Sequence, residues 1–300
     1  MSHIINRSQP IYAFSKEHAP ILNVKSGETV IIETYDCFEN QITSADSTYE
    51  SLDWSKVNPA TGPVYVEEAE VGDILEVTID DIKLEDQGVM AVSPGMGVLG
   101  ERITKFEAKL IPIENGKAIF NENIHLPLNP MIGVIGVAPQ GEPISCGTPG
   151  SHGGNMDNKM ITKGTTLYFP VFQQGALLAL GDLHAAMGDG EVCVTGIEIA
   201  GQVTVTIKVI KGKSLRNPVL ETEEFIGTIA SAKTIDEAVK MSVEDMVELL
   251  QDKLSLPLSE LTMLLSAVGQ TQICQVVDPL MTTRFLVPKW VLEKNNVSLF

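Results

Sequence analysis

Residues 175–191, GALLALGDLHAAMGDGE, hold the side chains of this sequence that are best suited to chemistry. An apolar run leads into Asp182 and His184, and the acidic loop Asp189-Gly190-Glu191 follows. Alternate residues of a β-strand point to the same face, so Asp182 and His184 are expected on one side of a strand end. A carboxylate on a buried strand is costly unless a cation lies beside it. The pair therefore predicts half of a metal site.

A second polar patch, PGSHGGNMDNK, lies upstream at residues 149–159. Its glycines, among them Gly153 and Gly154, allow the backbone to approach a ligand closely, and Asn155 and Asp157 add polar side chains. The same composition is also typical of a plain turn. The loop Asp189-Gly190-Glu191 has the same two interpretations, an exposed turn or the wall of a catalytic pocket.

Two further carboxylates lie on expected strands. Asp36 ends the strand TVIIETYD, and Glu198 interrupts the apolar segment VCVTGIEIAG. If residues 176–184 and 192–200 paired as a simple hairpin, Glu198 would lie about 13 Å from the position opposite Asp182. A simple hairpin therefore predicts that Glu198 is outside the site. Only a bulge or another partner strand would bring it in.

The elements that must position these residues are mostly strands. Turn glycines precede alternating or β-branched runs, and short strands separated by Gly and Pro favour antiparallel sheets in a sandwich or barrel. The expected strands are residues 29–34, 74–80, 109–113, 133–138, 166–171, 176–184, 192–200 and 203–210.

The pattern changes after residue 217. A strand-like FIGTIA precedes a helix of about twenty residues that starts after Thr234, whose spacing to Glu237 is that of a capping box. A second helix is expected from Ser259 to Gly269, followed by strands at 272–277 and 283–287. The sequence thus predicts an α+β, predominantly β fold. Residues 1–217 form an antiparallel β-sandwich-like body with most of the site, and residues 218–300 form a smaller helical α+β part packed on it.

Composition excludes several classes of function. With 300 residues and a formal net charge of −18, the chain is not expected to bind nucleic acid or an anionic membrane surface, and a small neutral substrate suits it better. The start, MSHIINRSQP, has no apolar signal segment, and no apolar run reaches the ~18 residues of a spanning helix. A cytoplasmic protein is therefore expected. Its four widely spaced cysteines are expected to be reduced and mostly buried.

The polar patches also resemble a known family. PGSHGGNMD at 149–157, GAL at 175–177, GDLH at 181–184 and GDGE at 188–191 resemble the acetamidase/formamidase family of metal-dependent amide hydrolases, in its acetamidase-like branch. The resemblance implies hydrolysis of a short-chain aliphatic amide, acetamide or formamide, to carboxylate and ammonia. It also implies a bound divalent metal and a homo-oligomer. We expect zinc in preference to calcium, and a homodimer or higher homo-oligomer. Met187 replaces the family's usual Gln, and Glu68 replaces its more usual Gly.

We assign roles on this basis as hypotheses. The metal would lower the pKa of its bound water to about 7 and polarise the amide carbonyl. The expected metal ligands are Asp36, Asp182, His184 and Glu198; the catalytic residues are Asp189, Glu191 and Asp157; the substrate or oxyanion residues are His152, Gly153, Gly154 and Asn155. Two alternatives stay open. One is a hydrolase of another linear or cyclic C–N bond, and the other is a non-catalytic, metal-stabilised β-sandwich that binds a partner.

Overall fold

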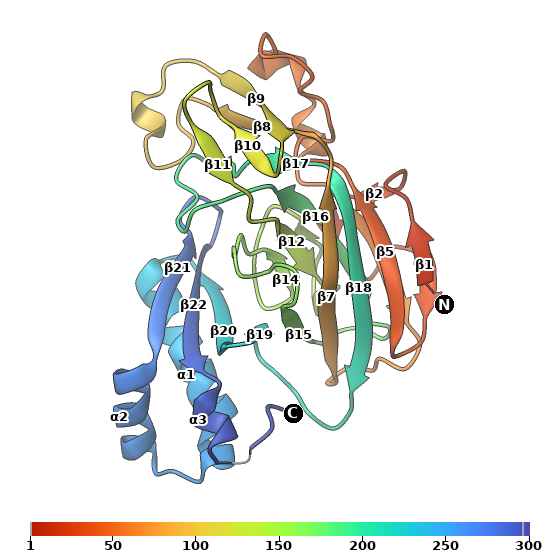
Figure 1. Ribbon diagram of the computed structural model, residues 1–300. Helices are drawn as coiled ribbons and strands as arrows, with labels where there is room; N and C mark the ends of the chain where they lie inside the picture. The colour runs from red at the N-terminus through yellow and green to blue at the C-terminus, as the bar shows by residue number, and fades with distance from the viewer. Residues whose placement is uncertain (1, 296) are drawn as a thin grey trace.

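β-Strands are the predominant regular elements of the chain, and nearly all of them assemble into two large sheets (Figure 1). This computed structural model describes residues 2–295 and 297–300. In Figure 1, β5, β7 and β18 lie side by side on one side of the molecule, and the three α-helices gather around β20–β22 on the other. The predicted α+β, predominantly β fold is confirmed.

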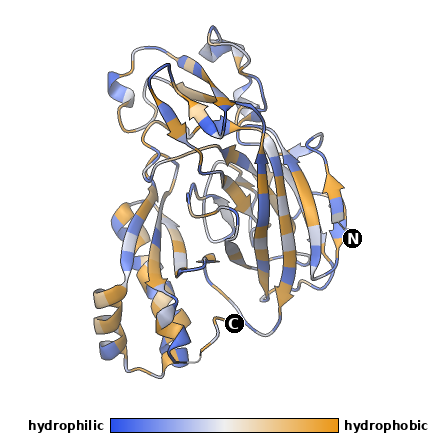
Figure 2. Ribbon diagram, in the orientation of Figure 1, coloured by the Kyte–Doolittle hydropathy of each residue, from blue (hydrophilic) through white to orange (hydrophobic). Residues whose placement is uncertain are grey.

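The first sheet has nine strands and is antiparallel except where β1 pairs with β5. In spatial order it contains β1 (Ser2–Ile5), β5 (Glu28–Thr34), β18 (Gly201–Ile210), β7 (Ile74–Leu84), β15 (Thr166–Pro170), β19 (Val219–Glu221), β20 (Phe225–Ala232), β22 (Met281–Pro288) and β21 (Gln270–Gln275). Buried and solvent-facing residues alternate along much of β18, and Figure 2 shows the matching hydropathy bands on β7 and β18. This period-2 pattern leaves one face of the sheet for the core.

The second sheet has eleven strands and carries the residues of chemical interest. Its main path is β11 (His125–Pro127), β10 (Lys117–Ile119), β9 (Glu107–Glu114), β8 (Gln87–Val92), β17 (Glu198–Ile199), β16 (Leu178–His184), β12 (Met131–Gly136) and β14 (Gly153–Asn155). The other three strands of this sheet are β6 (Ala60–Val66), which pairs with β16, and β2 (Pro10–Ile11) and β4 (Leu22–Val24), which pair with β6. β3 (Ala13–Phe14) and β13 (Ile144–Ser145) form a separate two-stranded sheet. Short 3-10 helices are η1 (Tyr49–Ser51), η2 (Trp54–Lys56) and η3 (Gly100–Arg102).

The two sheets share one hydrophobic core. Ile32 and Val205 of the first sheet belong to the same buried cluster as Ile135 and Leu180 of the second. Every residue of β12 and β16 is buried, so these two strands lie in the middle of the protein and not on a half-exposed face. Polar side chains on β16 are therefore forced into the interior.

The C-terminal part packs three helices against the far end of the nine-stranded sheet. α1 (Ile235–Leu254), α2 (Leu258–Val268) and α3 (Trp290–Glu293) share a second core with β20 and β22. α1 was predicted with these bounds, and the Thr234 hydroxyl accepts a hydrogen bond from the Glu237 N–H at 3.3 Å. Gly269 caps α2 with extended φ and ψ, and a Cβ there would lie 2.2 Å from Phe285 Cζ.

Strands on both sides of residue 217 hydrogen-bond to one another, since β19 pairs with β15 as well as with β20. The division of the chain at that residue stays a prediction. Among the described residues, no helix is both long and apolar enough to cross a membrane.

The expected strand at 192–200 is mostly wrong. Only Glu198–Ile199 is extended, and the preceding segment turns so that the Val194 N–H donates to Glu191 O at 3.0 Å. Val194 has a φ of 77°, which ends any strand. The strand β6 was missed because ATGPVYV contains Gly and Pro, which are unusual inside a sheet.

Replacing Thr234 by alanine removes the side chain that caps α1. We expect the free energy of unfolding to fall by about 1 kcal/mol, as measured by urea denaturation. The control Thr104→Ala, in an exposed loop, is expected to change it by less than about 0.5 kcal/mol. Equal unfolding midpoints for T234A and the unaltered chain would show that this cap does not stabilise the helix.

Candidate active site

β16 brings Asp182 and His184 together in the protein interior. Their side chains are almost fully buried, and His184 Nε2 lies 3.5 Å from Asp182 Oδ1. Asp182 has a φ of 56°, in the left-handed region, at the point where β16 stops pairing with β6 and starts pairing with β17. The side chains therefore meet although the strand is not regular between them.

Glu198 joins this pair through a register that differs from the simple hairpin. β17 pairs with β16 so that Glu198 lies directly opposite His184, and Glu198 Oε2 is 3.1 Å from His184 Nε2. The register of the simple hairpin considered from the sequence is wrong, because residues 185–197 form a long loop between the two paired strands. Glu198 is only 1% exposed.

Two more carboxylates converge on the same ring nitrogen. Asp157 Oδ1 lies 3.8 Å from His184 Nε2, and Glu191 Oε1 lies 3.9 Å from it. We name these five residues, Asp157, Asp182, His184, Glu191 and Glu198, the His184 cluster. Three of them, Asp157, Asp182 and Glu191, have positive φ. Such backbone strain costs about 1–3 kcal/mol per residue and concentrates at functional sites.

Two glycines make room for the cluster. A Cβ on Gly133 of β12 would lie 2.5 Å from Asp182 Oδ2 and 2.6 Å from Asp157 Oδ1. A Cβ on Gly196 would lie 2.5 Å from His184 Nδ1. The sequence did not reveal the role of either glycine, because no local pattern marks a glycine that contacts side chains from other parts of the chain.

The cluster holds more acid than its one imidazole can balance. Burial, with the charge of Asp182, raises the pKa of Asp157 to about 6. Burial likewise raises the pKa of Glu198 to about 8, and burial with Asp157 raises the pKa of Glu191 well above its usual value. Burial by itself would lower the pKa of His184, but the carboxylates of Glu198 and Asp182 raise this pKa well above its usual value. His184 in turn lowers the pKa of Asp182 despite burial.

A divalent cation fits these side chains. Within the described residues, Asp157 Oδ1, Asp182 Oδ1 and Glu198 Oε2 are buried without a hydrogen-bond partner. Ligand atoms of Asp157, His184 and Glu191 lie within 4.8 Å of one another, as do those of Cys37, Asp182 and Glu198. Cys37 was expected only as a buried thiol. Oxygen, nitrogen and sulfur ligands at such spacing suit zinc.

Asp189 and Asp36 have other partners. The Arg284 guanidinium donates to both Asp189 oxygens, at 3.0 and 2.8 Å, and Lys159 Nζ lies 2.8 Å from Oδ2. Asp36 Oδ1 accepts hydrogen bonds from the Phe38 and Asn40 N–H groups, which closes the turn after β5. The structure thus places both carboxylates outside the His184 cluster. Arg284, which is 1% exposed, was not singled out from the sequence.

The 149–159 patch forms β14 and the turns around it. His152 is fully buried with its ring 5.1 Å from that of Phe14, and burial lowers its pKa to about 4. The Gly153 N–H donates to Gly150 O at 3.0 Å, and Gly154 packs beside the His152 ring. The Asn155 amide donates to Asp278 Oδ2 at 3.0 Å. Of these residues, Asn155 is the one that lines a cavity.

A cavity of about 240 Å³ adjoins the cluster, and Cys37, Asn155 and Asp278 form part of its wall. A wider hollow of about 570 Å³ shares Cys193 and Thr195 with it and includes Glu191 and Met187. The other departure from the family pattern, Glu68, is exposed and accepts a hydrogen bond from the Ser26 N–H at 2.8 Å.

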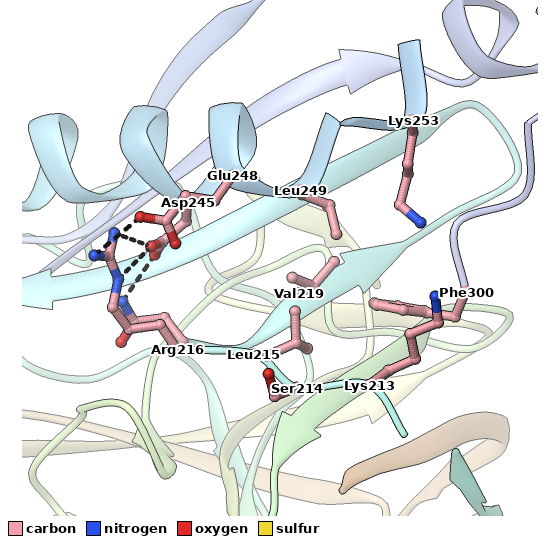
Figure 3. Close-up of a pocket in the computed structure, with 11 residues that line it drawn as sticks. Lys213, Ser214, Leu215, Arg216, Val219, Asp245, Glu248, Leu249, Lys253 and Phe300 are labelled. Atoms are coloured by element: carbon pink, nitrogen blue, oxygen red, sulfur yellow. Dashed lines mark hydrogen bonds and ion pairs between the residues drawn. The ribbon is translucent and has the colours of Figure 1, made fainter. Parts of the chain in front are cut away.

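A separate pocket of about 180 Å³ lies beside α1. Figure 3 shows Lys213, Lys253 and Phe300 on its wall, together with Arg216, which is paired with Asp245. Neither a residue of the His184 cluster nor Cys37, whose Sγ lies within ligand distance of Asp182 and Glu198, lines it. The chemistry is therefore assigned to the cavity beside Cys37 and not to this pocket.

Comparison with known proteins identifies the relatives of this chain. The model of the Acetamidase/Formamidase family matches residues 9–146 and 144–291. The chain belongs to the acetamidase/formamidase family. This family membership places it among the amidases, hydrolases that act on the C–N bonds of amides.

Two solved structures of the acetamidase/formamidase family resemble the chain closely. A predicted acetamidase/formamidase from Thermoanaerobacter tengcongensis is 51% identical, with a TM-score of 0.97 and 99% of each chain covered. An acetamidase from Bacillus halodurans is 49% identical, with a TM-score of 0.96, 98% of this chain covered and 100% of that one.

Three further relatives are more distant in sequence. The formamidase of Methylophilus methylotrophus is 27% identical over 75% of this chain and 72% of its own length. The acetamidase of Mycolicibacterium smegmatis is 27% identical over 69% of this chain and 68% of its own. A Schizosaccharomyces pombe relative that is 28% identical is matched over 64% of its length. The chain thus spans about two thirds of these relatives.

Gly133→Ala would place a methyl group against the carboxylates of Asp182 and Asp157. We expect the free energy of unfolding in urea to fall by about 1–3 kcal/mol, because an added methyl group in this tightly packed position must displace the two carboxylates. Gly141→Ala is the matched control, since a Cβ at Gly141 meets nothing within 4 Å. If both variants unfold at the same urea concentration, the site is less tightly packed than the structure indicates.

Proposed function

We propose that this family member hydrolyses a small, neutral, short-chain amide such as acetamide or formamide to carboxylate and ammonia, with a divalent metal held in the His184 cluster. The observation that carries the proposal is the convergence of four buried carboxylates on one imidazole nitrogen, in a chain whose relatives include a formamidase and an acetamidase. A homo-oligomer and a cytoplasmic location stay predictions.

Asp182, His184 and Glu198 are the ligands best placed to hold the metal. Glu198 Oε2 and Asp182 Oδ1 lie 3.1 and 3.5 Å from His184 Nε2, closer than the oxygens of Asp157 and Glu191. An imidazole ligand and the nearby Cys37 thiol favour zinc over calcium, which takes oxygen ligands. Asp36 is a weaker choice, because its Oδ1 already accepts two backbone hydrogen bonds. When bound, such a cation supplies Lewis-acid chemistry.

Glu191 is the residue best placed to move protons. Its carboxylate faces His184 from a loop, where it would accept a proton from the attacking water and donate it to the departing amine. An amine leaves poorly unless it is protonated, so the donation is as important as the acceptance. Asp157 lies beside Glu191 and would share this role. Asp189 is less suited, because Arg284 and Lys159 pair with its two oxygens.

Asn155 is placed to orient the substrate. Its amide group lines the cavity, and its Oδ1 is buried without a partner among the described residues. An amide NH₂ of the substrate would donate to this oxygen. The Gly153 N–H, expected as an oxyanion donor, already donates to Gly150 O. After hydrolysis the carboxylate product meets a strongly acidic site, which favours its release.

Removal of the metal tests the central assumption. A chelator that strips the protein is expected to reduce ammonia release from acetamide and formamide at least about 100-fold, because the cation's stabilisation of the transition state is lost. Added zinc should restore release. Unchanged release from metal-free protein would overturn the metal role. Release from neither substrate by the metal-loaded protein would overturn the substrate class.

The ligand assignment has its own test. Asp182→Asn and His184→Ala are expected to lose most of the metal measured by elemental analysis of the purified protein. Asp80→Asn, an exposed carboxylate on β7, is the matched control and should retain it. Circular dichroism would establish that the variants fold. Full metal content in both site variants would show that other residues bind the ion.

Glu191→Gln keeps the size of the side chain and removes its ability to carry a proton. We expect kcat to fall about 100- to 10,000-fold while the metal content holds. Glu142→Gln, in an exposed loop, is the control. Loss of metal together with activity would instead make Glu191 a ligand, and an unchanged kcat would assign proton transfer to another group.

A further inference from the structure

The 240 Å³ cavity beside the His184 cluster is apolar over most of its wall. Cys37 lines it together with Asn155 and Asp278, and Cys37 is also within ligand distance of Asp182 and Glu198. The apolar lining includes Phe38, Val57, Ala91 and Met96, and the rings of Trp54 and Phe106, which we name the aromatic wall.

Three aromatic rings give that wall a fixed shape. The Trp54 and Phe106 rings meet edge to face with centroids 6.5 Å apart, and Tyr49 stacks on Trp54 at 4.5 Å. Trp54 Nε1 donates to Tyr49 O at 2.9 Å, so its one polar atom is occupied. The aromatic wall is thus held in place by its own contacts and offers a ligand apolar surface and ring edges.

The cavity is larger than acetamide requires. Its volume equals that of roughly eight water molecules in the liquid, at ~30 Å³ each. The acyl part of acetamide ends in a single methyl group and would leave most of the apolar wall in contact with water. Val194, which also lines the cavity, is held at a φ of 77°, an outlying conformation for a β-branched residue.

We propose that the preferred substrates of this amidase are primary amides with an aryl or arylalkyl acyl group, which the aromatic wall binds while the carboxamide lies against Asn155. The proposal rests on the proposed amide hydrolysis and extends its substrate class from short-chain amides to amides with a larger acyl group. Trp54 and Phe106 are then specificity-determining residues. Burial of each extra carbon of the acyl group against them strengthens transition-state binding, and one methylene alone is worth about tenfold or more in such a pocket.

The experiment compares kcat/KM for phenylacetamide and acetamide with the metal-loaded enzyme. We expect a ratio of at least about ten in favour of phenylacetamide. Trp54→Ala and Phe106→Ala should each lower that ratio about tenfold or more. Trp290→Ala, a half-exposed tryptophan on α3, is the matched control and should leave it unchanged. Val57→Phe fills the cavity and should lower the ratio without removing a ring of the wall.

The outcomes separate this inference from the proposed function. If neither amide releases ammonia, the proposed hydrolysis fails. If acetamide is hydrolysed but phenylacetamide is not preferred, the proposed hydrolysis stands and the aromatic substrate class is overturned. A ratio that Trp54→Ala, Phe106→Ala and Val57→Phe all leave unchanged would also overturn it, because the wall would then make no contact with the acyl group.

Discussion

The repulsion among buried carboxylates is the constraint on which the rest of this structure depends. Four acidic side chains have oxygens within 3.9 Å of one imidazole nitrogen, where little water is present to screen them. One imidazolium could not balance four ionised carboxylates, and burial and mutual repulsion raise the pKa of Asp157, Glu191 and Glu198. The cluster is held together by the strands and loops around it, and a bound cation would relieve the repulsion.

The sheets supply the rigidity that this arrangement needs. β16 is buried on both faces and is paired along both edges, with β12 on one side and β6 and β17 on the other. The C-terminal part also contributes, since Arg284 of β22 binds Asp189 and the Gly190 N–H donates to Cys274 O of β21. The loop that carries Glu191 is thus anchored by residues almost a hundred positions away. This gives the helical C-terminal part a role in positioning the site.

The proposed substrate contacts and the proposed chemistry come from different parts of the fold. Asp182, His184 and Glu198 lie on the central strands β16 and β17, where backbone pairing fixes the geometry, whereas Trp54 lies on η2 and Met96 and Phe106 lie between β8 and β9. Loops tolerate sequence change better than buried strands do.

The sequence by itself determined the elements whose patterns are local. The periodicity of α1, the alternation of β18 and the apolar run of β16 each depend on neighbouring residues, and so the α+β, predominantly β fold was predictable. Asp182 and His184 were equally visible as candidate site residues, because polar residues follow directly on a buried run. Only the tertiary structure decided which groups surround them. Glu198 arrives through the strand register, Asp157 from the end of β14, and Cys37 and Gly133 from segments far along the chain. Contacts of this kind depend on how strands pair and where the backbone turns with positive φ, and no short stretch of sequence encodes either one alone.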